Sequence, residues 1–163
     1  MQGKNQTQAT AEPGKQELFI TREFEAPREM VFESFTDPAD LVEWLLHSNL
    51  EMKIDYMDYR PGGRYRFLLP GPGGKPVGLF GVVHEVLVPE RLIRTFEYEG
   101  LPERGHVALE KVGFETLAGD RCKVTIQYIC ESVEFRDGLV NSGMEQAFTA
   151  SFQKLDNILE KRL

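Results

Sequence analysis

Two arginines occupy strand positions where an alternating pattern predicts apolar side chains. Arg22 shares its phase with Ile20 and Phe24, and Arg94 has a similar place in a later strand. A buried charge is costly without a partner, and a guanidinium matches the two oxygens of a carboxylate. The pattern indicates either anchors for an anionic ligand head group, or arginines that reach solvent at a sheet end or pair internally with Glu85.

Five polar residues could form an acid/base site if the fold brings them together: His84, Glu85, Tyr98, His106 and Tyr128. Either His84 or Glu85 must point inward, because successive residues of a strand face opposite sides. A dry interior shifts pKa values readily, which suits proton transfer. The spacing of the five residues does not show that they meet.

Other common signatures of catalysis and cofactor binding do not occur in the sequence. His47, His84 and His106 lack the i, i+4 spacing of metal ligands on a helix, and no GxSxG elbow supplies a nucleophile. Residues 71–76 (GPGGKP) differ from a phosphate loop in spacing, and their prolines remove amides. We therefore predict no metal, no cofactor and no catalytic residue.

The charge and hydropathy of the chain disfavour two classes of partner. The 163 residues carry a formal net charge of −7, which disfavours binding to nucleic acid. No apolar run reaches the roughly 18 residues of a membrane span, and the first residues lack the order of a signal peptide. We expect a cytoplasmic protein without a membrane span.

The N-terminal segment 1–16 has too few apolar side chains to offset the entropy of ordering it. We predict a disordered tail over 1–16 and a single domain over 17–163. A strand is expected at 18–26. Ala26-Pro27 and Asp37-Pro38 then start two short helices, because proline suits the first helical position and aspartate caps free amides.

From Leu50 the apolar period changes to two, which predicts a run of antiparallel strands separated by turns. Their approximate spans are 50–59, 64–69, 77–88, 91–98, 106–116 and 121–131. The only cysteines, Cys122 and Cys130, fall on the last strand. Their separation there is about 26 Å, so we expect both to be reduced.

The C-terminal segment carries an apolar stripe at helical spacing from Val140 to Leu159. It predicts one helix over about 142–162, roughly 31 Å long and able to cross a sheet. Ser142 and Glu145 have the spacing of a capping box at its start. The expected fold class is α+β, with the apolar face of the sheet buried under this helix.

A set of motifs extends over about 18–160, nearly the whole predicted domain. The motifs are Arg22-Glu23-Phe24-Glu25-Ala26-Pro27, Thr36-Asp37-Pro38, Trp44, Asp58-Tyr59-Arg60-Pro61-Gly62-Gly63, Gly81 with Glu85-Val86, Pro89-Glu90-Arg91-Leu92 and Gly143-Met144-Glu145-Gln146. In order and spacing they resemble the bacterial proteins related to the C-terminal domain of the activator of heat-shock-protein-ninety ATPase.

This resemblance implies membership of the START-like (SRPBCC) superfamily and its helix-grip fold. That fold is a curved seven-stranded antiparallel sheet around a long C-terminal helix, with a cavity between them and two short helices after the first strand. The chain departs from the family pattern at three places. Residues 44–47 (WLLH) replace paired tryptophans and a proline, Ala147 replaces a glycine, and Cys122 replaces a threonine.

The implied cavity makes inward-facing residues candidate ligand contacts, although aromatic residues at these spacings serve equally as packed core. The candidates are Trp44, Phe67, Phe80, Phe96, Tyr128, Met144, Phe148, Phe152, Arg22, Arg94 and Glu85.

Three functions are open. A cavity-forming architecture without a catalytic signature favours a module that binds a small hydrophobic or amphipathic molecule. The family resemblance implies a chaperone as an alternative partner. Analogy with polyketide cyclases of the same superfamily gives a third hypothesis, an enzyme acting on an aromatic guest, although fold is weak evidence of function.

Overall fold

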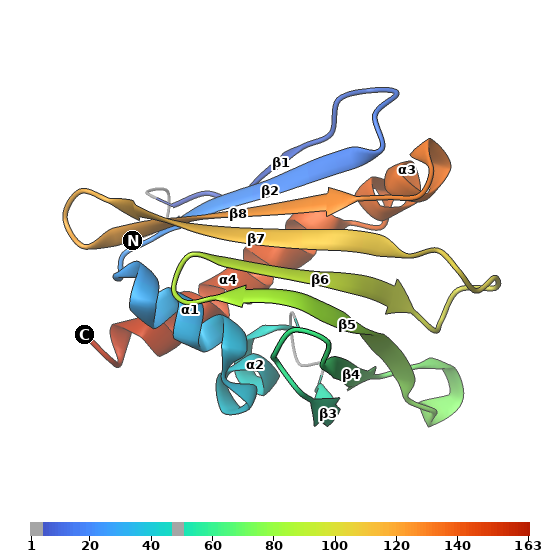
Figure 1. The fold of residues 1–163 in the computed structure, drawn as a ribbon, viewed down its shortest axis with the longest axis horizontal. Helices are drawn as coiled ribbons and strands as arrows, with labels where there is room; N and C mark the ends of the chain where they lie inside the picture. The colour runs from blue at the N-terminus through green and yellow to red at the C-terminus, as the bar shows by residue number, and fades with distance from the viewer. Residues whose placement is uncertain (1–4, 47–50) are drawn as a thin grey trace.

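The computed structural model describes residues 5–46 and 51–163, which form a curved antiparallel sheet and four α-helices (Figure 1). The strands are β1 (Gln8–Thr10), β2 (Glu17–Phe24), β3 (Lys53–Met57), β4 (Arg64–Leu69), β5 (Val77–Leu87), β6 (Arg91–Tyr98), β7 (Ala108–Leu117) and β8 (Arg121–Ile129). The helices are α1 (Arg28–Thr36), α2 (Pro38–Trp44), α3 (Val133–Asn141) and α4 (Met144–Glu160), and η1 (Pro72–Gly74) is a single 3-10 turn.

The sheet has the order β1-β2-β8-β7-β6-β5-β4-β3. Helices α1 and α2 connect β2 to β3, which forms the opposite edge of the sheet (Figure 1). An antiparallel meander from β3 to β8 then returns to β2, where Ile20 pairs with Ile126. The α+β helix-grip fold is thus confirmed.

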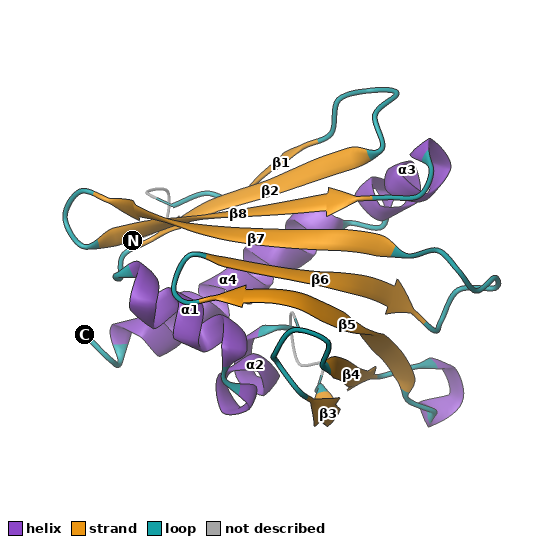
Figure 2. Ribbon diagram, in the orientation of Figure 1, coloured by secondary structure: helices purple, strands orange, loops and turns teal. Residues whose placement is uncertain are grey.

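Helices α1, α2 and α4 pack together against one face of the sheet (Figure 2). Phe152 of α4 lies 5.2 Å from Phe24 and 5.9 Å from Trp44, measured between ring centroids. The Trp44 indole donates a 2.9 Å hydrogen bond to the Ser34 carbonyl, so the buried ring has no unpaired polar atom. These contacts place the dense core at the C-terminal half of α4.

The N-terminal segment is not a disordered tail over its described part, and this corrects the predicted boundary. Gln8–Thr10 pairs with β2 as an eighth strand, where seven were expected. Main-chain hydrogen bonds order the segment in place of apolar side chains. The Ala9 amide also donates to the Glu145 carboxylate of α4 at 3.1 Å, and Arg136 donates to the Glu12 carbonyl at 2.8 Å.

The C-terminal region contains a break that the apolar stripe did not reveal. Val140 belongs to α3, and α4 begins only after Gly143, whose φ of 85° ends helical geometry. The predicted capping box is wrong. The Ser142 hydroxyl donates back to the Leu139 carbonyl, and the Glu145 carboxylate accepts from the N-terminal segment.

The remaining predicted elements lie within a few residues of those observed, although His47 and Leu50 fall outside the described residues. Both cysteines are free, as expected, and both are buried. Within the described ranges, no helix combines the length and apolar character needed to cross a bilayer.

Arg22 lies on the buried face of β2, as its phase predicts, and is neutralised by α4. Its guanidinium donates to both oxygens of Asp156, at 2.8 and 2.5 Å. The Arg22 side chain is only 4% exposed. The pair therefore ties the first long strand to the terminal helix.

Replacing Asp156 by alanine should lower the free energy of unfolding by about 3 kcal/mol, because the Arg22 charge would stay buried without a carboxylate. Urea denaturation measures the change. The exposed Glu160→Ala on the same helix is the control and should cost less than about 0.5 kcal/mol. Equal losses in the two variants would contradict a stabilising pair.

The loop between β6 and β7 is anchored through His106. The His106 ring lies 2.5 Å from a Glu131 oxygen and 3.4 Å from a Glu103 oxygen, and it stacks on Phe135 of α3 at 5.3 Å. The hydrogen bond to Glu131 raises the pKa of His106 above its usual value, with a smaller contribution from Glu103. The charged imidazole thus favours the folded loop.

The contribution of His106 to stability should be complete below the unfolded pKa of about 6.5 and should vanish as pH rises through the folded value. The difference in unfolding free energy between wild type and His106→Gln should therefore be larger at about pH 5.5 than at about pH 9. Urea denaturation at both pH values measures it. A difference that grows with pH would contradict the assignment.

Candidate functional site

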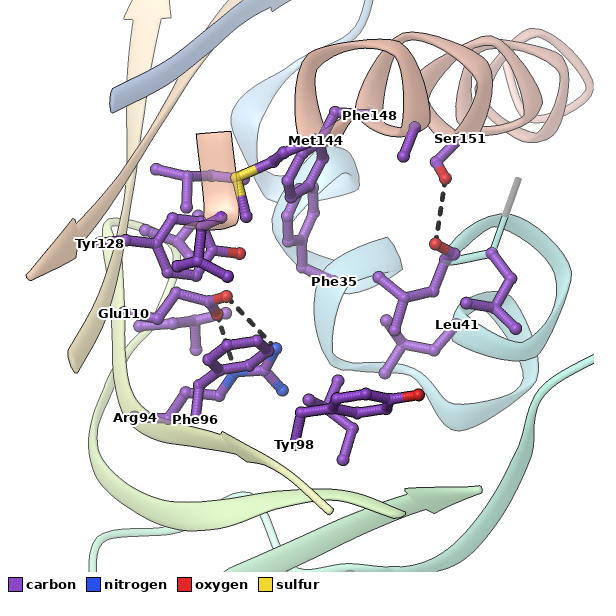
Figure 3. A pocket seen from close by; sticks show the side chains of 18 of the residues that line it. Phe35, Leu41, Arg94, Phe96, Tyr98, Glu110, Tyr128, Met144, Phe148 and Ser151 are labelled. Atoms are coloured by element: carbon purple, nitrogen blue, oxygen red, sulfur yellow. Dashed lines mark hydrogen bonds and ion pairs between the residues drawn. The ribbon is translucent and has the colours of Figure 1, made fainter. Parts of the chain in front are cut away.

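A pocket of about 350 Å³ lies between the inner face of the sheet and the N-terminal half of α4 (Figure 3). Helix α2 and the end of α3 complete its wall. Most of the lining is aliphatic or aromatic, and Met144, Ala147 and Phe148 present one face of α4 to the space. The C-terminal half of α4 is packed, whereas this half is only partly buried.

The polar floor of the pocket is an ion pair between neighbouring strands. Arg94 of β6 and Glu110 of β7 are directly opposite in the sheet register. The Arg94 guanidinium donates to Glu110 at 2.7 Å from Nε and 3.4 Å from Nη2, and Nη1 donates to the Tyr59 hydroxyl at 2.6 Å. The side chains of Arg94 and Glu110 are 13% and 7% exposed, so the pair is largely desolvated.

Aromatic rings support this ion pair from behind. The Arg94 guanidinium carbon lies 4.3 Å from the centre of the Tyr65 ring, a cation–π contact. The Tyr65 hydroxyl donates to the Thr95 carbonyl at 2.6 Å, which fixes the ring. The guanidinium is therefore held by a carboxylate, a phenol and an aromatic face at once.

Two tyrosine hydroxyls at the floor remain neutral. Burial raises the pKa of Tyr128, and the nearby Glu110 charge raises it further. Burial also raises the pKa of Tyr59, although the Arg94 charge acts in the opposite direction. The site therefore combines neutral phenols with an ion pair of zero net charge.

Seven of the predicted site residues line the pocket: Trp44, Glu85, Arg94, Phe96, Tyr128, Met144 and Phe148. Figure 3 shows Arg94, Glu110 and Tyr128 on the sheet side of the space, facing Met144 and Phe148 of α4. Glu85 contributes from the rim, where its carboxylate pairs with Arg91 and not with Arg94.

Four predicted residues do not line it. Arg22 is paired with Asp156, and Phe67 and Phe152 are fully buried in the packed core. Phe80 faces the other side of the sheet, where the Arg104 guanidinium carbon lies 5.3 Å from its ring centre. Because Leu79 and Phe80 are both apolar, alternation alone did not define the phase of β5.

Sequence reasoning missed Glu110 and Tyr59. A signal for Glu110 existed, because it alternates with the buried Ala108 and Val112 just as Arg94 alternates with apolar neighbours. The predicted strand over 50–59 included Tyr59, but β3 ends at Met57 and Tyr59 lies in a segment without regular structure, so alternation did not define the direction of its side chain. Pairing with Glu85 was one of the alternatives for an inward arginine, and the structure pairs Arg94 with Glu110 instead.

The fold brings only part of the proposed acid/base group together. Glu85, Tyr98 and Tyr128 line the pocket, but His84 is exposed and His106 belongs to the loop anchor. None of the hydrogen bonds among the described side chains joins two of these five residues. Over the same ranges, no cluster of three or more His, Cys, Asp or Glu side chains could hold a metal ion.

A second pocket of about 750 Å³ adjoins the first beside α3 and the β6–β7 loop. Phe96, Tyr98, Leu139 and Ser142 line both. We call this second pocket the vestibule, because it adjoins the first through these shared residues; Glu103, His106 and Glu134 also line it.

Solved structures of other bacterial proteins share this architecture. A crystal structure of a Rhodobacter sphaeroides protein is 27% identical, with a TM-score of 0.82 over 94% of this chain and 98% of that one. A Mycobacterium smegmatis protein is 20% identical, with a TM-score of 0.83 over 96% and 99% of the two chains. A Silicibacter pomeroyi protein described as AHSA1 is 20% identical, with a TM-score of 0.72 over 90% and 99%. The latter two show the fold alone.

None of the curated proteins compared with the chain matches it. The family model described as "Activator of Hsp90 ATPase homolog 1-like protein" matches residues 25–160, which include every strand except β1 and β2 and all four helices. The chain belongs to this family of Activator of Hsp90 ATPase homolog 1-like proteins.

Proposed function

We propose that this protein binds a small hydrophobic or amphipathic molecule non-covalently between the sheet and α4. The observation that carries the proposal is the apolar space of about 350 Å³ beside α4. Protein interiors are normally close-packed, so a space of this size forfeits many dispersion contacts unless a guest fills it. Ligand pockets commonly have this lining, with a few polar groups at one end.

A binding role accounts for the site better than catalysis does. The polar groups at the floor are bonded to one another, with Arg94 held by Glu110 and Tyr59. A general acid or base must instead be free to exchange a proton with substrate. Among the described side chains, no hydrogen bond joins two of the five acid/base candidates, which supports the same conclusion.

Replacing Ala147 by tryptophan should fill the pocket, because Ala147 lines it from α4. We expect the affinity for a neutral apolar dye to fall at least about tenfold, with the melting temperature unchanged or raised. Fluorescence titration and thermal melting measure both quantities. Native mass spectrometry of the purified wild type should also show a bound small molecule that Ala147→Trp lacks.

Gln146→Trp is the matched control, since Gln146 is the exposed neighbour of Ala147 on the same helix. It should bind the dye as wild type does. Undiminished binding by a folded Ala147→Trp variant would place the dye elsewhere and remove the proposal.

The family match supports a second candidate function, contact with an Hsp90-type chaperone. Calorimetric titration of the whole chain with the middle domain of such a chaperone tests it. Saturable binding would support the contact, whereas heats equal to those of dilution would eliminate it.

A further inference from the structure

The charge balance at the pocket floor restricts what can occupy it. Arg94 is the one cation among the described lining residues, and Glu110 neutralises it at 2.7 Å. A ligand carboxylate placed beside Arg94 would also lie beside the Glu110 carboxylate, and like charges repel strongly where water is excluded. A ligand amine would meet the Arg94 charge in the same way. Either ion would add an unbalanced charge to a largely desolvated site.

The same floor retains hydrogen-bonding capacity for a neutral group. A guanidinium has five N–H groups, and three of them form the bonds to Glu110 and Tyr59. The Tyr128 hydroxyl lines the pocket beside this pair. Burial and its hydrogen bond to Glu110 keep it protonated, and its oxygen can still accept a bond from a ligand hydroxyl. A ligand hydroxyl or carbonyl can pair with such groups without changing the net charge.

The rest of the pocket defines an apolar body for the ligand. The Ser151 hydroxyl on the opposite wall already donates to the Leu45 carbonyl at 3.0 Å, and Glu85 is engaged by Arg91 at the rim. About 350 Å³ equals roughly a dozen water-sized volumes. This space fits a molecule of about ten to fifteen non-hydrogen atoms.

The vestibule offers an anion no electrostatic attraction. Its charged lining residues are Glu103, His106 and Glu134, and no lysine or arginine is found among the described residues that form it. Electrostatic attraction of an anionic ligand would require the opposite balance.

We propose that the pocket selects uncharged amphiphiles, with a hydroxyl or carbonyl group at the Arg94–Glu110 pair and an apolar body against α4. This inference rests on the proposed function and adds the ligand class. It also answers the question of an anionic anchor raised by the sequence: Arg94 is neutralised internally and does not attract a carboxylate. Glu110 is therefore the specificity-determining residue.

A matched series of decyl compounds tests the inference by displacement of a neutral apolar dye near neutral pH. We expect 1-decanol to bind wild type at least about tenfold more tightly than decanoate or decylamine. Glu110→Gln removes the neutralising charge beside Arg94, so decanoate should gain at least about tenfold relative to 1-decanol in this variant. Glu115→Gln, an exposed change of the same kind on β7, is the control and should keep the wild-type order.

The possible outcomes distinguish failure of the neutral-ligand inference from failure of the proposed binding function. Decanoate binding to wild type as tightly as 1-decanol would overturn the neutral-ligand inference and leave the binding function intact. A folded Glu110→Gln variant that keeps the wild-type order would also overturn it. If no decyl compound displaces the dye, the proposed function itself fails. Should Glu110→Gln not fold, as judged by thermal melting, Arg94→Gln replaces it and should shift preference toward decylamine.

Discussion

Phe152 of α4 packs edge-on against Phe24 and stacks on Trp44, and this contact fixes where the terminal helix can approach the sheet. The Arg22–Asp156 pair reinforces the same end. A straight helix over a curved surface cannot be equally close along its whole length. Because these contacts fix the C-terminal half of α4 against the sheet, its N-terminal half lies further from the curved surface. The pocket is the space that remains under that half.

Within that hollow, the register of two strands determines the chemistry. Arg94 and Glu110 face each other across β6 and β7, so their pairing needs no loop or long side-chain reach. A buried ion pair of this kind contributes little to stability compared with apolar packing. Removing one member is nevertheless costly, because the other charge then stays buried without a partner. The Arg94–Glu110 pair thus places polar groups in an apolar pocket without adding net charge.

Much of the fold was predictable because it depends on periodicity, which a sequence displays directly. The strands from β4 to β8 and the phase of Arg22 follow from alternation, and proline and aspartate mark the starts of α1 and α2. Three features depend on information that periodicity does not carry. The pairing of β1 arises from main-chain bonds, the break at Gly143 from backbone geometry, and the phase of Phe80 from its equally apolar neighbour Leu79. At the site, the apolar wall was largely predictable, whereas the partner of Arg94 required the strand register.

The short strand β1 has a consequence for the outer edge of the sheet. Without it, β2 would present a row of free amides and carbonyls, the kind of surface on which another chain can extend a sheet. β1 pairs with β2 from Phe19 to Thr21, and the Arg136 guanidinium donates hydrogen bonds to the carbonyls of Glu12 and Glu17. A polar segment and one arginine thus cover part of the β2 edge on which another chain could otherwise extend the sheet.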